Sequence, residues 1–422
     1  MEFRNLTPFD AMAFTSLDRQ DRPCHIVAMS VGYQLQAVYP QALPHHSDYA
    51  QHQALVMDRE PLPLCLADAH WGDAAHSSMR QESDLAPFKP RCDVLVTGHA
   101  HARELHSTFE VGLQVQQGPS QLLDKRLQVT GPRVLQRGDG FGAWLREGLN
   151  PTRAYSLGTA ERVRQVPLRY ELAYGGACVV ANPKAAKSGK TQQGQHPEHL
   201  INEVCYQNPL GAGWMVQGYL DALAQTPQGL PATLRAPQIM RSGQYFDRLV
   251  QTAQSGAMDA KQMAQLDYKL EVAGLGPLSK AWAPRLALAG TYDEDWLTNR
   301  HPMAPKDFDH AYWNGAPKDQ QIPWPDLTQG LSLRTENLRP GGGPLRVKLP
   351  AHRAFVLADL GGVRLPLPMS IDTLTLDSDT LQLRLVWRVS MLHSMQPETL
   401  ELRFEVDPKA PLVKYKNMED PA

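Results

Sequence analysis

Histidines at short spacing are the first residues in this chain whose type and position could do chemistry. His99 and His101 lie two residues apart in a predicted strand, so both side chains would face the same way and could share a metal ion. His106 follows closely, and His196 and His199 form a second pair. No acidic or cysteine ligand stands at ligand spacing, and no HExxH motif is present. We therefore expect polar histidines on a solvent-facing strand and no metal site, with a weakly bound metal as the minor alternative.

The segment Ser188-Gly189-Lys190-Thr191 ends like a phosphate-binding loop. That motif also requires a glycine five residues before Gly189, so that bare backbone amides can wrap the phosphates, and the chain has Lys184 there. The residues that follow, QQGQHPEHL, cannot form the apolar face of a helix whose N-terminus would hold the anion. We therefore predict a surface loop, and we expect neither a nucleotide nor any other cofactor.

Nucleophilic and carboxylate chemistry have no specific support in the sequence. No serine has glycines both two residues before and two residues after it, so the strained turn of esterases is missing. Cys24 and His25 are neighbours, and neighbours on a strand point to opposite faces. Carboxylate pairs such as Asp293 and Asp295 occur, but a chain with 44 acidic residues offers many of them. We predict that the protein has no catalytic residues and is not an enzyme.

Aromatic and proline-rich clusters remain, and the longest runs from Gly290 to Gln321. Trp296 and Arg300 are four residues apart, which on one turn of helix lets the guanidinium stack on the indole. Trp, Tyr and Arg also dominate interaction hot spots. An alternative is that these rings pin long loops onto a β core. The candidate partner-binding residues are Trp296, Arg300, Phe308, Tyr312, Trp313 and Trp324.

The composition restricts the classes of function. The 422 residues carry 42 Lys and Arg against 44 Asp and Glu, a net charge of -2, which excludes the broad basic field of nonspecific nucleic-acid binding. No apolar run reaches the ~18–20 residues of a membrane helix. Glu2 and Asp10 stand where a signal peptide would need a basic stretch, and the five cysteines are scattered. We expect a cytoplasmic protein with reduced thiols.

Strands are the elements that the apolar pattern predicts most clearly. From Leu381 to Met391 the apolar residues fall on every second position, with Val386 as the one break, which indicates a half-buried strand. Asp377-Ser378-Asp379 has the turn chemistry of a hairpin. The pattern recurs, so residues 345–406 are predicted to form a four- or five-stranded antiparallel sheet. Strands are also predicted at 26–31, 94–96, 109–115 and 168–174.

A polar loop, a helix and one further strand are predicted for the middle of the chain. Residues 181–200 contain almost no large apolar side chain and are predicted to form an exposed polar loop, and residues 257–273 are predicted to form a helix that ends at Gly274. Leu286 and Leu288 suggest one more strand.

The 34 prolines and 31 glycines favour loops and turns over a helical bundle. We predict a mainly β fold (β-sandwich or open-barrel sheets) with a few helices and long loops, and an α+β fold is the minor alternative. The predicted divisions are an N-terminal β-rich domain at 1–180, a mixed helix and loop region at 181–330, a C-terminal antiparallel sheet at 331–410, either packed with the N-terminal sheet as one body or separate, and a tail at 411–422.

Four strings in a fixed order carry a resemblance to a known family. They are SDLAPFKPRCDVLVTGHAHA (83–102), PLRYELAYGG (167–176), YQNPLGAGW (206–214) and WAPRLALAGTYDEDWLTNRHPMAPKDFDHAYWNGAPKDQ (282–320). The chain resembles a bacterial domain-of-unknown-function family found beside type VI secretion genes. Its members are described as adaptors, or chaperones, for effectors with a tip domain of the proline-alanine-alanine-arginine repeat (PAAR) type. The resemblance runs from Asn5-Leu6-Thr7-Pro8-Phe9 to about Arg388.

Two departures limit what the resemblance implies. The loop at 181–200 is long and lysine-rich, and Leu210-Gly211-Ala212-Gly213 stands where Val-Gly-Arg-Gly is expected, so no role of that arginine carries over. The resemblance otherwise implies a cytoplasmic, non-enzymatic protein that binds an effector or its PAAR-like domain and helps to load it onto the VgrG spike protein. Such an adaptor could add a strand to its client or offer a groove to an apolar segment. Segment 291–326 is our candidate for the client surface.

Two other classes of function stay open at this point. One is a carbohydrate- or peptide-active hydrolase that uses a carboxylate pair in a β-sandwich cleft. The other is a structural subunit of a contractile, phage-like assembly. Two convergent acids with raised pKa values would favour the hydrolase, whereas a broad apolar groove or an exposed sheet edge would favour the adaptor.

Overall fold

The structure, a computed structural model, describes residues 1–37, 52–58, 60–74, 77–138, 140–142, 145, 155–174, 178–181, 200–203, 232–243, 246–255 and 273–412. Strands predominate in these residues, and the only helix among them longer than six residues is α4 (Phe246–Ser255). The prediction of a mainly β chain with few helices and long loops is confirmed. Most of the predicted loop at 181–200 and of the predicted helix at 257–273, together with most of the tail, lies outside the described residues.

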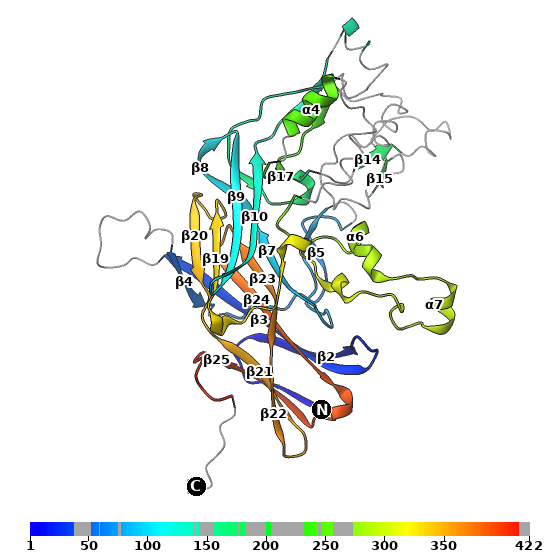
Figure 1. The fold of residues 1–422 in the computed structure, drawn as a ribbon, viewed down its shortest axis with the longest axis vertical. Coiled ribbons are helices and arrows are strands. Elements are labelled where there is room, and N and C mark those ends of the chain that lie inside the picture. The colour runs from blue at the N-terminus through cyan, green and yellow to red at the C-terminus, as the bar shows by residue number, and fades with distance from the viewer. Residues whose placement is uncertain are drawn as a thin grey trace, which may run out of the picture.

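A large mixed sheet forms the centre of the molecule (Figure 1). Its strands in spatial order are β17 (Ile239–Arg241), β10 (Ser120–Thr130), β9 (Thr108–Gln117), β19 (Leu331–Glu336), β20 (Pro344–Lys348), β4 (His52–Met57), β3 (Pro23–Ala37), β24 (Gln382–Leu392), β23 (Ser370–Asp377), β7 (Cys92–Thr97) and β18 (Gln321–Ile322), with β2 (Asp10–Leu17) paired to β3. Most neighbours are antiparallel, but β23 runs parallel to β7 and β20 runs parallel to β4.

A second, four-stranded sheet lies below the large one in the view of Figure 1. Its order is β1 (Glu2–Asn5), β25 (Thr399–Glu405), β21 (Arg353–Asp359) and β22 (Arg364–Pro368). The smaller pairings are β12 (Tyr155–Leu157) and β16 (Thr233–Arg235) on β11 (Val134–Arg137), β13 (Val163–Pro167) with β8 (His99–His106), β14 (Cys178–Ala181) with β15 (Leu200–Glu203), and β5 (Ala69–His70) with β6 (Met79–Gln81).

The C-terminal strands exist as the sequence predicts, but they do not form one sheet. β23 and β24 form the predicted hairpin and enter the large sheet, where β24 pairs with β3 and β23 pairs with β7. β21, β22 and β25 belong to the four-stranded sheet with β1. The division arises because the chain leaves the large sheet after β20 and returns to it only for the hairpin. Segments from both ends of the chain therefore share both sheets.

One hydrophobic cluster joins the two sheets. Leu385 and Trp387 of β24 and Val356 of β21 belong to it, together with Leu400 and Leu402 of β25. All five side chains are buried, and for β24 and β25 the period-two pattern of the sequence predicts this. The sheets are thus held by one continuous core.

Two predicted strands are helical in the structure. Leu168–Tyr174 contains the 3-10 helix η3 (Tyr170–Leu172), because Tyr170 turns into the core and donates a hydrogen bond to the Gly276 carbonyl. The segment around Leu286 and Leu288 forms α6 (Ala283–Leu286) and the 3-10 helix η5 (Ala287–Ala289). Both strand predictions are wrong, because alternating apolar residues over so short a segment do not distinguish a strand from a tight helical turn.

The remaining helices of the described residues are short. They are α7 (Glu294–Asn299) and the 3-10 helices η6 (His310–Trp313), η7 (Lys318–Gln320), η8 (Leu327–Gln329) and η9 (His393–Met395). In the described part of the chain no helix has the length and apolar character that crossing a membrane requires.

Candidate functional site

Three adjacent strands of the large sheet turn a polar face away from the core. On β7, Val94 and Val96 enter the core, while alternate residues point to the other side. Thr375 of β23 is the register partner of both Leu95 and Arg384, so these three side chains lie on the same side. We call this surface the polar face. Its members are Asp93, Leu95 and Thr97 of β7, Thr373, Thr375 and Asp377 of β23, and Arg384, Val386 and Arg388 of β24.

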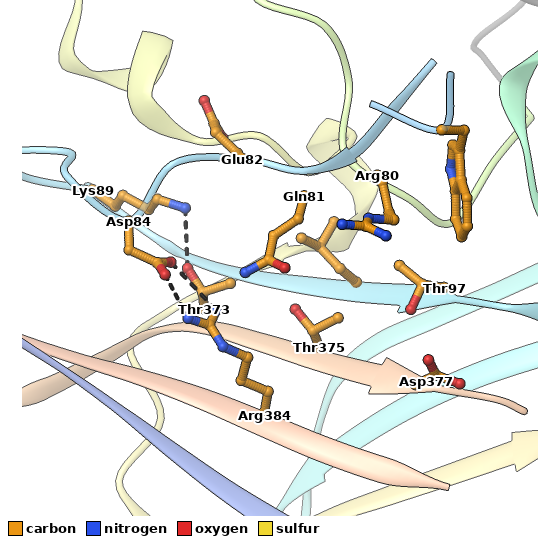
Figure 2. A pocket seen from close by; sticks show the side chains of 12 residues that line it. Arg80, Gln81, Glu82, Asp84, Lys89, Thr97, Thr373, Thr375, Asp377 and Arg384 are labelled. Atoms are coloured by element: carbon orange, nitrogen blue, oxygen red, sulfur yellow. Dashed lines mark hydrogen bonds and ion pairs between the residues drawn. The ribbon is translucent and has the colours of Figure 1, made fainter. Parts of the chain in front are cut away.

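A chain segment from β6 to the start of β7, residues 79–91, covers the polar face and leaves a pocket beside it (Figure 2). The pocket has a volume of about 300 Å³. Arg80 and Gln81 line one side of it, and Thr97, Thr375 and Asp377 of the polar face line another. The walls of the pocket therefore carry hydroxyl, amide, guanidinium and carboxylate groups beside the apolar side chains of Trp71 and Leu95.

A buried ion pair fixes the cover to the sheet. The ammonium of Lys89 donates to Asp93 Oδ2 at 2.9 Å and to the Thr373 hydroxyl at 3.0 Å. Burial lowers the pKa of Lys89, but the charges of the neighbouring carboxylates, Asp93 foremost, outweigh this effect and hold the pKa above its ordinary value. Lys89 is therefore a buried cation at neutral pH.

Asp93 also anchors a loop that lies more than two hundred residues further along the chain. Its two carboxylate oxygens accept hydrogen bonds from the Asn314 side chain and from the backbone amides of Gly315 and Ala316, at 2.9 to 3.2 Å. With Lys89, the carboxylate has four donors and no exposed surface. This residue thus ties the end of the aromatic-rich segment to the cover and the sheet.

Two carboxylates of the pocket, Glu82 and Asp84, are each engaged by an arginine. Glu82 pairs with Arg285, and Asp84 pairs with Arg384. Burial raises the pKa of Glu82 despite the opposing charge of Arg285. Figure 2 shows the two acidic side chains directed to opposite sides of the covering segment, so they do not converge on a common point. This geometry gives no support to a hydrolase that uses this pair.

The predicted histidine pair lies on β8, but His101 is buried and does not face solvent as expected. His99 Nδ1 and His101 Nε2 each lie 2.8 Å from one oxygen of Asp379, in the β23–β24 turn. The side chains therefore face the same way, and Asp379 occupies the position between them. Among the described His, Cys, Asp and Glu residues, no group of three or more is placed to hold a metal ion. His196, His199 and the Ser188–Thr191 segment lie outside the described residues.

The predicted Trp296 and Arg300 lie on and just after the short helix α7. Asp293 caps the helix by accepting from the Trp296 amide, and the Trp296 indole donates to the Met303 carbonyl at 2.9 Å. The Arg300 guanidinium donates to the Ala304 carbonyl and to Asp21. The predicted stacking of Arg300 on Trp296 is not among the cation–π contacts of the described residues. Both side chains are half-buried and hold the segment together.

The other predicted rings pack on one another or on the cover. Phe308, Tyr312 and Trp313 form a cluster with ring centroids 5.5 to 6.2 Å apart. The Trp324 ring packs edge-on against Phe88, and its indole nitrogen donates to the Lys89 carbonyl at 3.0 Å. Trp324 is nevertheless 42% exposed. It is thus the member of the predicted set that offers the most ring surface to a partner.

Large apolar side chains that were not among the predicted partner-binding residues are also exposed. We define the arm as residues 283–309, which contain α6, η5 and α7 and project from the sheets in Figure 1. Four of its large apolar side chains are at least 40% exposed, and Leu297 reaches 62%. They are Leu286, Tyr292, Leu297 and Met303. The exposed acidic residues of the arm are Asp293, Glu294, Asp295, Asp307 and Asp309.

The residues that build the polar face were overlooked as functional candidates, although the sequence contains a signal for some of them. Lys89 and Asp93 both stand within the string of residues 83–102, and a lysine between two prolines in an apolar stretch is unusual. The string of residues 282–320 contains Arg285 and the Asn314-Gly315-Ala316 loop. Two of the strings that carry the family resemblance therefore meet at one buried polar network.

A protein-family model described as "Uncharacterized protein conserved in bacteria (DUF2169)" matches residues 43–388. The match spans the polar face, its cover and the arm. No curated protein matches the chain, and no solved structure matches it.

Proposed function

From the premise that the chain belongs to the uncharacterized bacterial family DUF2169, we propose that it is a non-enzymatic adaptor, or chaperone, for a type VI secretion effector. In this proposal the protein binds the effector or its PAAR-like tip domain in the cytoplasm and helps to load it onto the VgrG spike. The resemblance of the four sequence strings supports the identity of the client. Neither nucleic acid, nucleotide nor membrane has a part in it.

The exposed apolar surface of the arm is the observation that carries the binding role. Large apolar side chains on a thin projection cannot be buried by their own fold, and such surfaces mark interaction sites. Leu297 is 62% exposed and Tyr292 is 58% exposed, on either side of the capped start of α7. Of the two modes of client binding, this favours contact with an apolar segment over strand addition.

The charge of the arm indicates which client segment fits. The arm carries five exposed carboxylates against one exposed lysine, Lys306, while the guanidinium of Arg300 is already engaged by Asp21. An apolar segment that carries Lys or Arg is complementary to this surface, because charge complementarity favours encounter and selects partners.

In this proposal the arm binds the client, and the polar face anchors the arm. The half-buried rings of Trp296, Phe308 and Trp313 hold the arm in shape, and the network on Asp93 fixes its base to the sheet. The exposed residues are then free for the client. The hydrolase alternative has no supporting observation, since Glu82 and Asp84 diverge and each has an arginine partner.

Affinity capture from the native host tests this function. Tagged protein should retain an effector with a PAAR-like domain, and mass spectrometry identifies it. Leu297→Asp and Tyr292→Asp should reduce the captured effector at least tenfold, because they place charge in the apolar contact. Val363→Asp is the matched control, since Val363 is 65% exposed in the β21–β22 turn. Equal capture by all three variants, or capture of no such effector, would refute the proposal.

A further inference from the structure

A second hollow lies on the polar face, on the other side of Lys89 from the pocket of Figure 2. Its volume is about 210 Å³. Phe88 and Trp324 form an aromatic wall, while Ser370, Asp372, Arg388 and Ser390 supply the polar lining. The hollow thus contains one of the residues predicted to bind a partner, and the polar network does not fill it.

Arg388 is the unusual group in this lining. Its Nε donates to Asp372, but its Nη1 and Nη2 are buried and have no hydrogen-bond partner in the described part of the chain. The side chain is 7% exposed. Unsatisfied buried donors are rare, and each one costs free energy that a fitting acceptor recovers.

A register shift in β23 places Asp372 beside this arginine. Ser370 is the register partner of Arg388, and a register shift between Ile371 and Thr373 leaves Asp372 as an extra residue beside it. Such bulges re-aim side chains and are common next to functional sites. Asp372 orients one edge of the guanidinium through Nε, which leaves the two terminal nitrogens for another acceptor.

One additional cation near the hollow favours an anion. The two cations of the lining, Lys89 and Arg388, each have one carboxylate partner, Asp93 and Asp372 respectively. Arg19, from the β2–β3 turn, lies 4.0 Å from the centroid of the Phe88 ring and adds a third cation near the aromatic wall.

We propose that this hollow binds a carboxylate that is borne beside an aromatic or aliphatic group. The carboxylate accepts from the two terminal nitrogens of Arg388, a bidentate geometry that guanidinium groups favour. The attached apolar group packs on Phe88 and Trp324. In the cell the ligand is a segment of the client polypeptide, and this identification alone rests on the proposed function.

The test uses the intact protein labelled with 5-fluorotryptophan, with 3-phenylpropionate as the probe and the uncharged 3-phenylpropionamide as its matched partner. The ¹⁹F resonance of Trp324 is assigned by its disappearance in Trp324→Phe. We expect a saturable shift of this resonance with the acid and at least tenfold weaker binding of the amide, because the amide lacks the charge that Arg388 recognises.

Two variants separate the binding role from folding. Arg388→Gln should abolish the shift, but it also leaves Asp372 unpaired. Ser390→Phe fills the hollow from an exposed position and should weaken binding of the acid at least tenfold, whereas Ser120→Phe, at the exposed start of β10, should bind as the wild type does. Equal binding of acid and amide, no saturable shift, or unchanged binding by Ser390→Phe would overturn the proposal.

Capped peptides then distinguish the two sources of a carboxylate in a polypeptide. A dipeptide that ends in a free phenylalanine carboxylate represents a chain terminus. An amidated Phe-Asp dipeptide represents an acidic side chain. The peptide that competes with 3-phenylpropionate identifies which of the two carboxylates the hollow binds. Client capture that Ser390→Phe leaves intact would overturn the assignment to the client while the adaptor role stands. If Leu297→Asp loses the effector while Ser390→Phe retains it, the adaptor role stands and only the identification of the ligand as a client segment fails.

Discussion

The Nζ of Lys89 lies 2.9 Å from Oδ2 of Asp93, and neither side chain is more than 5% exposed. The pair joins the segment that covers the polar face to the sheet beneath it. Asp93 carries further hydrogen bonds from the Asn314-Gly315-Ala316 loop. One carboxylate therefore holds together the cover, the strand that follows it and a loop more than two hundred residues further along the chain.

Removal of Lys89 should destabilise the protein strongly. Lys89→Met leaves Asp93 as a buried charge without its cation, and breaking such a pair costs about 3–5 kcal/mol. A urea titration followed by circular dichroism measures the shift of the unfolding midpoint. Arg4→Met is the control, since Arg4 forms a surface pair with Glu2. A shift for Lys89→Met no larger than that of the control would contradict the structural role of the pair.

Gly315 should not tolerate a methyl group. A Cβ at this position would overlap Glu82 Oε2, and Glu82 is held by Arg285 on its other side. We expect Gly315→Ala to lower the free energy of unfolding by about 1–3 kcal/mol through overpacking. Gly112→Ala, whose Cβ would lie 3.6 Å from the Glu336 side chain, is the matched control. Equal unfolding midpoints of the two variants would show that the site has more room than the structure gives it.

Acid should weaken the junction between the sheets through His352. Burial lowers the pKa of His352, and its Nδ1 lies 3.0 Å from the Tyr33 hydroxyl. A histidine with a lowered folded-state pKa contributes stability above its ordinary pKa of about 6.5, and this contribution is lost as the pH falls below that value. The wild type should therefore lose more stability between pH 7 and pH 5 than His352→Asn does. Parallel losses in urea titrations at both pH values would rule this contribution out.

The arm should depend on Trp296 for its shape and not on Leu297. The Trp296 indole contacts the rings of Tyr292 and His301 and donates to the Met303 carbonyl, whereas Leu297 points to solvent. Trp296→Ala should speed tryptic cleavage after the exposed Lys306 several-fold, and Leu297→Ala should leave the cleavage rate unchanged. The reverse order of cleavage rates would mean that the packing of the arm is misassigned.

The period-two pattern predicted most strands, but it did not predict what packs against the polar side of each strand. β24 forms as predicted, yet its polar side chains Arg384 and Arg388 form ion pairs within the protein, Arg384 with Asp84 of the covering segment and Arg388 with Asp372 of β23. Val386, the one break in the alternation, is fully buried on that same face. The break in the alternation indicated that this face of β24 is covered, but nothing in β24 itself identifies the segment that covers it.

The candidate site could be predicted only in part, because its partners are separated in sequence. Lys89 and Asp93 are four residues apart, so their pairing was within reach of local reasoning. Glu82 and Arg285 are separated by 203 residues, and only the fold brings them together. The aromatic segment was singled out as a candidate surface, but spacing alone could not tell its half-buried rings from the exposed Leu297. Whether the six predicted residues bind a partner stays a prediction.

Reconstitution of the complex tests the central claim most directly. The purified protein is mixed with the effector that affinity capture identifies, the mixture is separated by size-exclusion chromatography with light scattering, and the intact mass of the effector is measured before and after. The account predicts a complex that co-elutes, that Leu297→Asp disrupts, and in which the effector keeps its mass. Failure to form a complex, or a change in the covalent mass of the effector, would contradict it.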